Sequence, residues 1–217
     1  MFLAWGDESG SVPSLDPGAF LLAAAVCAVG DLDGLRERMT RMRRPSEKKI
    51  HWRDDSRVRH DEVTREIAAA GVEAIVVVRV GPLDERPERR RRKCFERFAA
   101  EVERSGCRIL TMESRGAGLD RKDRDMVDAM RAARTVDGTL RLEHAPGPAE
   151  PMLWIADAVC GGSSRAGPGT RHSSGVSSGP CTSSRSGHDA SPGPCRPAGS
   201  PEAHFHDHRD GVARPRG

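Results

Sequence analysis

The chain has 217 residues and a formal net charge of +3, a length that suits one domain with an appendage. Residues 1–160 hold 28 basic and 28 acidic side chains, so the positive excess lies entirely in residues 161–217. A neutral body excludes a uniformly basic nucleic-acid-binding domain. No targeting segment opens the chain, and its longest apolar run, residues 19–29, is shorter than the roughly 18 residues of a membrane span. We therefore expect a soluble, cytoplasmic protein.

The first predicted strand covers residues 2–6 and leads directly into Asp7 and Glu8. Segment 11–18 carries two prolines and a glycine, which predict a turn. Residues 19–29 are apolar throughout, as expected for a strand covered on both faces. The two strands predict a hairpin with both carboxylates at the end of its first strand. Because burying an unpartnered carboxylate costs several kcal/mol, the pair needs an exposing turn, a cation or a metal.

The rest of the body alternates between helix and strand. Apolar residues at spacings of three and four predict helices at residues 31–44, 59–71, 88–106, 120–134 and 150–160. Gly71 and Gly106 are predicted to end the second and third of these. β-Branched or alternating runs predict strands at residues 72–80, 107–113 and 139–145, while residues 48–56 are ambiguous. This order predicts an α/β fold with a mixed, mostly parallel sheet, opened by an antiparallel hairpin and flanked by helices.

The composition changes abruptly after residue 160. Gly, Pro and Ser supply 29 of residues 161–217, with only three large apolar side chains among them. No core can form from such a segment, so we predict a domain at residues 1–160 and a disordered tail at residues 161–217. One hypothesis is that the tail is an out-of-frame translation of GC-rich DNA. It fails if neither other reading frame of the gene continues an amphipathic helix after Cys160.

Cysteine spacing gives no sign of a zinc site or a redox motif, because none of the six cysteines forms a CxxC pair. Cys27 and Cys94 lie in apolar surroundings, where reduced, buried thiols are expected.

Five segments in order resemble the domain of unknown function 3800 family. They are DESG after a short apolar strand, the apolar return strand, ERRRRKCFERF, MESR and HAPGPAEPMLWIADAVCG. The similarity runs from Met1 to about Gly162. It implies a ribonuclease H-like fold, in which carboxylates on the first strand, a later strand and a late helix surround a divalent metal.

The resemblance also implies roles for four acids. Asp7 matches the first-strand acid, and Glu8 is the second acid of the family's Asp-Glu pair. Asp157 matches the aspartate of a late glutamine-x-x-aspartate motif, although Trp154 replaces the glutamine. Glu113 is a looser match to the acid of the later strand.

Asp7, Glu113 and Asp157 are therefore the predicted catalytic ligands of Mg²⁺ or Mn²⁺, with Glu8 as a further ligand or a support. Carboxylates from separate elements suit Mg²⁺, and two such ions can activate a water and stabilise the leaving oxygen of a phosphodiester. Asp157 is the only charge in PMLWIADAV and needs a partner, which is either the metal or an arginine. Taken singly, Asp7 can instead cap a turn and Glu113 can face solvent.

Three further side chains are predicted to contact the substrate. Lys49 and His51 precede Trp52, and a tryptophan beside a cation suits stacking on a base, although a half-buried anchor is an equal alternative for Trp52. His144 ends a strand near the expected site, where it can shuttle a proton or, alternatively, have a structural role. The basic run at residues 89–93 offers phosphate contacts or, alternatively, a solvated helix face balanced by neighbouring acids.

Together these features predict a metal-dependent nuclease, a hydrolase, or a related phosphoryl-transfer enzyme acting on nucleic acid. Two alternatives stay open. One is a non-catalytic module of the same fold that binds nucleic acid or protein, and the other is an inactive, truncated copy.

Overall fold

The computed structural model describes residues 1–10 and 18–165, all within one of two structural units, Met1–Thr170. Most of the predicted 11–18 turn and nearly all of the predicted tail therefore lie outside the described residues. The described strands are β1 (Phe2–Gly10), β2 (Ala19–Ala28), β3 (Glu73–Val80), β4 (Cys107–Glu113) and β5 (Arg141–Ala145). The described helices are α1 (Leu32–Met42), α2 (Arg57–Ala69), α3 (Pro87–Arg104), α4 (Ala117–Ala132) and α5 (Pro151–Arg165).

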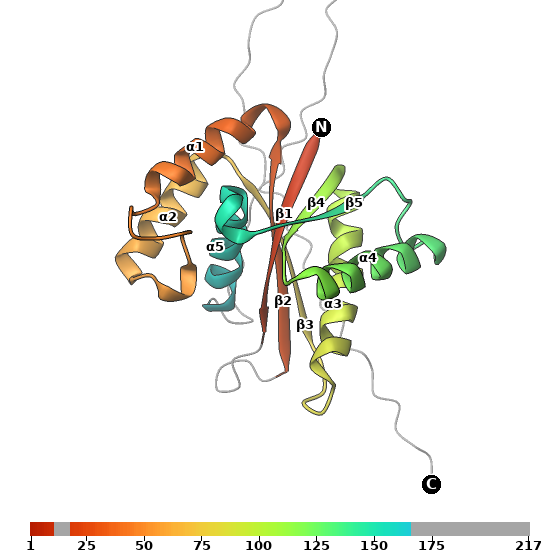
Figure 1. Cartoon of the computed structure of the whole chain (residues 1–217). Coiled ribbons are helices and arrows are strands. Elements are labelled where there is room, and N and C mark those ends of the chain that lie inside the picture. Colours follow the sequence, from red (N-terminus) through yellow and green to blue (C-terminus); the bar gives the residue numbers. More distant parts are fainter. Residues whose placement is uncertain (11–17, 166–217) are drawn as a thin grey trace, which may run out of the picture. The chain divides into compact units, whose positions relative to one another are not determined.

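The five strands form one mixed sheet in the order β3-β2-β1-β4-β5 (Figure 1). β2 pairs antiparallel with β1 and with β3, whereas β4 pairs parallel with β1 and with β5. The predicted α/β class and opening hairpin are confirmed. Although β1, β3, β4 and β5 share one direction, only half of the neighbouring pairs are parallel because β2 separates β1 from β3.

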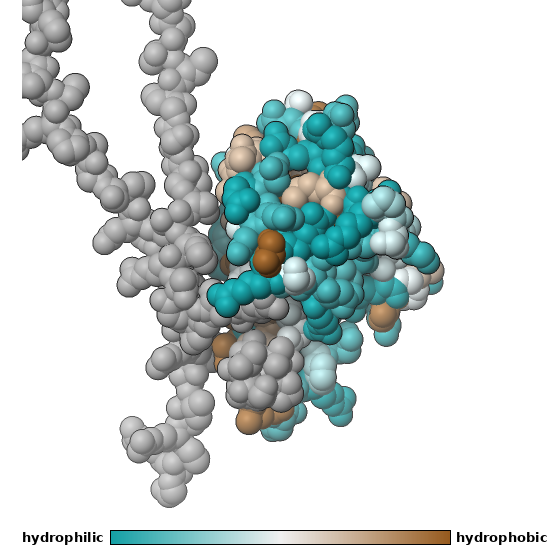
Figure 2. Space-filling model, turned by 90° about the vertical axis from the view of Figure 1, so that its left-hand side faces the viewer, coloured by the Kyte–Doolittle hydropathy of each residue, from teal (hydrophilic) through white to brown (hydrophobic). Residues whose placement is uncertain are grey.

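Helices cover both faces of the sheet, with α1, α2 and α5 on one side and α3 and α4 on the other (Figure 1). Alternation along the strands builds a core on each face. On the α3 side, Ala4 and Leu22 pack with Phe98, and on the α5 side Trp5 packs with Ile155. Burying each large apolar side chain contributes about 1.5–3 kcal/mol. The outward surface over α1 and α2 is mostly hydrophilic (Figure 2).

β1 is longer than predicted, and this matters for the site. Its pairing with β2 continues through Asp7 and Glu8 as far as Gly10, so the prediction that both carboxylates follow the strand is wrong. The paired register with β4 stops at Gly6 opposite Met112. From Asp7 onward β1 therefore has a neighbouring strand on one flank only, and the other flank is open.

Several local predictions are confirmed. Gly71 and Gly106 follow α2 and α3 with φ angles of 67° and 78°, the left-handed conformation that favours glycine after a helix. Cys27 and Cys94 are buried and have free thiols. α5 continues past the predicted end at residue 160 to Arg165. No helix in the described part of the chain is both long and apolar enough to cross a membrane.

Candidate functional site

Strand alternation separates the two neighbouring carboxylates of β1, because successive side chains point to opposite faces of a sheet. Asp7 lies on the α5 face, where the Cys160 thiol of α5 contacts its carbonyl oxygen. Glu8 lies on the α3 face, where its Oε2 accepts a hydrogen bond of 2.7 Å from Nε of Arg91. Asp7 and Glu8 therefore belong to two different clusters of side chains, and Glu8 is paired with Arg91.

The first of these, the acidic cluster, consists of Asp7, Glu113 and Asp157 and draws on β1, β4 and α5. Burial raises the pKa of Asp7 to about 7, and the negative charges of Asp157 and Glu113 contribute to the increase. A backbone hydrogen bond at Glu8 and the charge of Lys49 act in the opposite direction. Asp157 and Glu113, which are far from Asp7 in sequence, thus lie close enough to Asp7 to act on its charge.

Lys49 provides the positive charge of this cluster. Its Nζ donates hydrogen bonds of 2.8 and 2.9 Å to the two carboxylate oxygens of Glu113. Glu113 also lies against Gly147, where a Cβ would collide with its carboxylate. The side chain of Glu113 is therefore confined between a lysine and a glycine backbone.

Asp157 is satisfied by the main chain and not by an arginine. Its Oδ2 accepts a 2.9 Å hydrogen bond from the backbone N–H of Trp52, and Nδ1 of His51 lies 3.4 Å from the same oxygen. Trp154 is buried in the core and donates its indole N–H to the carbonyl of Gly147 at 2.7 Å. The predicted residues Lys49 and His51 thus both lie at the acidic cluster.

Trp52 anchors the segment that carries Lys49 and His51. Its side chain is only 9 % exposed and stacks on His60 with ring centroids 3.9 Å apart. The indole also packs against Gly161 of α5, at a place where a Cβ would collide with the ring. A tryptophan buried in this way serves as an anchor and has little surface left for stacking on a base.

We predict opposite effects for alanine at two adjacent glycines of α5. Gly161→Ala is expected to lower the free energy of unfolding by about 1–3 kcal/mol, because the new methyl group meets the Trp52 ring. Gly162→Ala is the matched control: its Cβ would meet that ring only at 3.8 Å or more. It should raise stability by roughly 0.5–1 kcal/mol through helix propensity. Urea unfolding of both variants measures this, and equal effects would contradict the anchoring role.

The second cluster is a buried ion network formed by Glu8, Arg91, Arg115, Asp120, Asp123 and His144. At its centre, Arg91 binds both oxygens of Asp123 at 2.7 and 3.0 Å. Burial alone would raise the pKa of Asp123, but hydrogen bonds from His144 and Arg91 and the charges of Arg91 and Arg115 hold it well below its usual range. The network joins β1, α3, α4 and β5.

His144 belongs to this ion network and not to the acidic cluster. Its Nε2 lies 3.5 Å from Asp123, its Nδ1 lies 3.4 Å from Arg124, and its side chain is only 4 % exposed. The structure therefore separates it from Lys49 and His51, with which it shared a predicted substrate role.

The sequence prediction included Arg91 only as part of the basic run at residues 89–93, and for this buried residue the alternative of a solvated face is wrong. It did not single out Asp123, although a signal was present. Asp123 lies four residues before Val127, so it continues the buried stripe of α4 with an acid. Arg91 lies four residues before Phe95 and continues the stripe of α3 with a base. Two facing helices with opposite charges on their core-facing stripes are typical of a buried ion pair.

A cavity of about 140 Å³ lies between the two clusters, beside the open flank of β1. Its lining residues are Asp7, Glu8, Arg91, Met112, Glu113, Ser114 and Arg115. Asp7 and Glu113 of the acidic cluster line the cavity together with the two arginines of the ion network. Negatively and positively charged side chains therefore border the same cavity.

Among residues 1–10 and 18–165, no three His, Cys, Asp or Glu side chains are already arranged as a metal site. The donor chemistry of the acidic cluster nevertheless fits Mg²⁺ or Mn²⁺, because carboxylate oxygens are the ligands that such hard cations prefer. Binding an ion would require Lys49 to leave Glu113 and the carboxylates to move closer together.

Comparisons with known proteins reveal a shared fold. No protein-family model matches the sequence, and no curated protein does. In the structure of the PCNA:RNase HII complex from Archaeoglobus fulgidus, a chain matches with a TM-score of 0.51 and 17 % identity, over 77 % of this chain and 74 % of that chain. Ribonuclease H2 from Pyrococcus horikoshii OT3 matches over the same shares with a TM-score of 0.40 and 12 % identity. The first likeness shows a ribonuclease H-like fold, and at this identity it shows the fold alone.

Proposed function

We propose that this protein is a metal-dependent nuclease that hydrolyses phosphodiester bonds of nucleic acid, with Asp7, Glu113 and Asp157 as its metal ligands. The observation that carries the proposal is the placement of Asp7 and Glu113 on one cavity, with Asp157 near enough to help burial raise the pKa of Asp7. Perturbed acids of this kind are typical of functional sites. A ribonuclease H-like fold and an adjoining cavity support the same reading.

Each residue of the site has a separate role in this proposal. A bound divalent ion would activate the attacking water and stabilise the leaving oxygen. Trp52 orients the carboxylate of Asp157 by donating its main-chain N–H to Oδ2. His51 lies 3.4 Å from Asp157 and can hold a proton at the edge of the site. In the net reaction, water adds to phosphorus as the bond to the sugar oxygen breaks.

A non-catalytic nucleic-acid-binding module is the second candidate. It is favoured by the ion pair between Lys49 and Glu113, which neutralises a predicted ligand, and by the fact that no preformed metal site lies within the described ranges. An inactive, truncated copy is the third, and it predicts a protein without cooperative unfolding.

Cleavage assays with an Asp157→Asn variant test the proposal. Wild-type protein with Mn²⁺ or Mg²⁺ is expected to nick labelled DNA, RNA or an RNA–DNA hybrid, and Asp157→Asn should lose more than about 100-fold of this activity. Asp125→Asn removes an exposed carboxylate of α4 and is the matched control. Cleavage that survives Asp157→Asn, or a folded wild type that cuts none of these substrates, would contradict the proposed function.

A further inference from the structure

The arginine side of the cavity has no part in the proposed metal chemistry. Arg91 and Arg115 line the cavity together with Asp7 and Glu113. Both guanidinium groups face the same two acids of the ion network, Glu8 and Asp123. The two arginines differ in how tightly these acids hold them, and the difference suggests separate roles.

Arg91 satisfies both acids without help. Its Nε donates to Glu8 at 2.7 Å, while its two Nη atoms donate to Asp123 at 2.7 and 3.0 Å. All three guanidinium nitrogens are thus engaged in short, charge-assisted hydrogen bonds. Its side chain is buried, so Arg91 is a structural cation that stays in place.

Arg115 approaches the same acids at longer range. Its Nη1 lies 3.5 Å from Glu8, and its Nη2 lies 3.2 and 3.3 Å from the oxygens of Asp123. Its Nε is buried and has no hydrogen-bond partner among residues 1–10 and 18–165. Because Arg91 already pairs with both acids, Arg115 can turn toward another anion without leaving a buried carboxylate unpaired.

The backbone of Arg115 is held firmly in position. Its N–H donates to Oδ1 of Asp120 at 2.9 Å, and the hydroxyl of Ser114 donates to Oδ2 at 2.6 Å. Asp120 therefore fixes the short connection between β4 and α4 from which the Arg115 side chain extends. A guanidinium that extends from a fixed backbone is suited to binding a ligand at one place.

We propose that Arg115 binds one phosphate group of a nucleic-acid strand in this cavity, next to the acidic cluster. This inference rests on the proposed function and names the substrate contact. A volume of about 140 Å³ is well below the roughly 300–1,000 Å³ of pockets that enclose drug-sized ligands, so the space suits a phosphate and not a whole nucleotide. The planar fork of a guanidinium matches phosphate oxygens, and such a contact positions a strand without reading its sequence.

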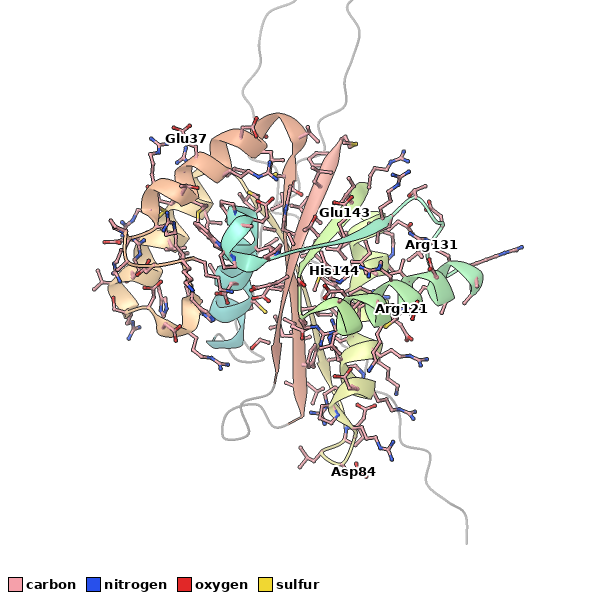
Figure 3. The ribbon with its side chains drawn as sticks, in the orientation of Figure 1. Glu37, Asp84, Arg121, Arg131, Glu143 and His144 are labelled. Carbon is pink, nitrogen blue, oxygen red and sulfur yellow. The ribbon has the colours of Figure 1, made fainter. Side chains whose placement is uncertain are left out.

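Binding of a short, fluorescently labelled single-stranded DNA, measured by anisotropy in EDTA, tests the inference. Arg115→Gln is expected to weaken binding about tenfold, as the loss of one charge-assisted contact predicts. It should also lower the slope of log K against log salt by about 1. Arg121→Gln makes the same charge change at an exposed position of α4 (Figure 3) and should alter binding less than twofold.

Equal losses in Arg115→Gln and Arg121→Gln would overturn the inference, as would a folded wild type that does not bind the DNA. If Arg115→Gln fails to unfold cooperatively, Arg115→Lys is measured in its place, since lysine keeps the positive charge but has no planar guanidinium group. An intermediate loss of affinity in Arg115→Lys would support the phosphate contact. Because the assay contains no metal and no cleavage step, arginine-dependent binding by a protein that never cuts would overturn only the proposed nuclease activity.

Discussion

Asp7→Asn is expected to stabilise the metal-free protein at about pH 8 and, at the same time, to abolish the stabilisation that Mn²⁺ gives the wild type. Asn keeps the shape of the side chain but cannot ionise. It therefore removes the repulsion from Asp157 and Glu113 together with the cost of burying a charge. A ligand of the folded state at a hundredfold excess over its Kd adds about 2.7 kcal/mol, and the variant should lose this gain.

The sign of the pH dependence follows from proton binding. The carboxyl of Asp7 has an ordinary pKa of 3.8 and a pKa of about 7 in the folded protein, so between these values the folded state binds more protons. Stability then falls as pH rises from about 4 to 7, by roughly 1.4 kcal/mol per pH unit at most. The advantage of Asp7→Asn should consequently be a few kcal/mol at about pH 8 and disappear near pH 4.

Thermal melts with and without Mn²⁺ at both pH values measure these effects. Asp84→Asn removes an exposed carboxylate in the loop after β3 and serves as the control, with no change in either quantity expected (Figure 3). A variant that still gains stability from Mn²⁺ would show that Asp7 is not a ligand. A lower melting temperature of metal-free Asp7→Asn at about pH 8 would show that no repulsion is relieved there.

Local patterns predicted most of the elements because their causes are local. Gly71 and Gly106 end helices through their own backbone freedom, and the apolar run of β2 needs no partner to be recognised. The extension of β1 through Asp7 and Glu8 has a different cause, namely hydrogen bonding to β2. Nothing in the residues 7–10 themselves favours a strand, so the sequence prediction ended it too early.

The same division between local and long-range causes explains why only part of the candidate site was predicted. Asp7, Glu113 and Asp157 have recognisable positions at or near the ends of apolar segments, and the structure places Glu113 and Asp157 within electrostatic range of Asp7. The placement of Lys49 depends on Trp52, whose ring packs against Gly161, more than 100 residues later in the chain. No periodicity within residues 48–56 could indicate such a contact.

The alternation of side chains along a strand already predicts that Asp7 and Glu8 lie on opposite faces of the sheet. Neighbouring residues of a strand face opposite sides, so Asp7 and Glu8 could not both belong to one face of the sheet. The structure gives each its own cation, Lys49 near Asp7 and Arg91 beside Glu8. The acidic cluster holds three carboxylates and one lysine and contains a destabilised acid, whereas the ion network contains three acids and two arginines. The two carboxylates of β1 therefore belong to two different charge clusters.

Asp123→Ala is expected to destabilise the protein by about 3–5 kcal/mol, because removing one partner of a buried ion pair leaves the other charge uncompensated. Asp123 is 2 % exposed and is the bidentate partner of the buried Arg91. Its pKa lies below the ordinary value, so its contribution to stability is complete above about pH 4 and is lost as pH falls below that. Urea unfolding at about pH 7 measures the loss.

Two comparisons separate the ion pair from general damage to α4. Asp125→Ala, at an exposed position of the same helix, should change stability by no more than about 0.5 kcal/mol. Replacing Arg91 and Asp123 together with leucine should cost less than the sum of the single replacements, since neither charge is then left alone. A loss below about 1 kcal/mol in Asp123→Ala, or strict additivity in the double variant, would mean that Glu8 alone suffices to hold Arg91.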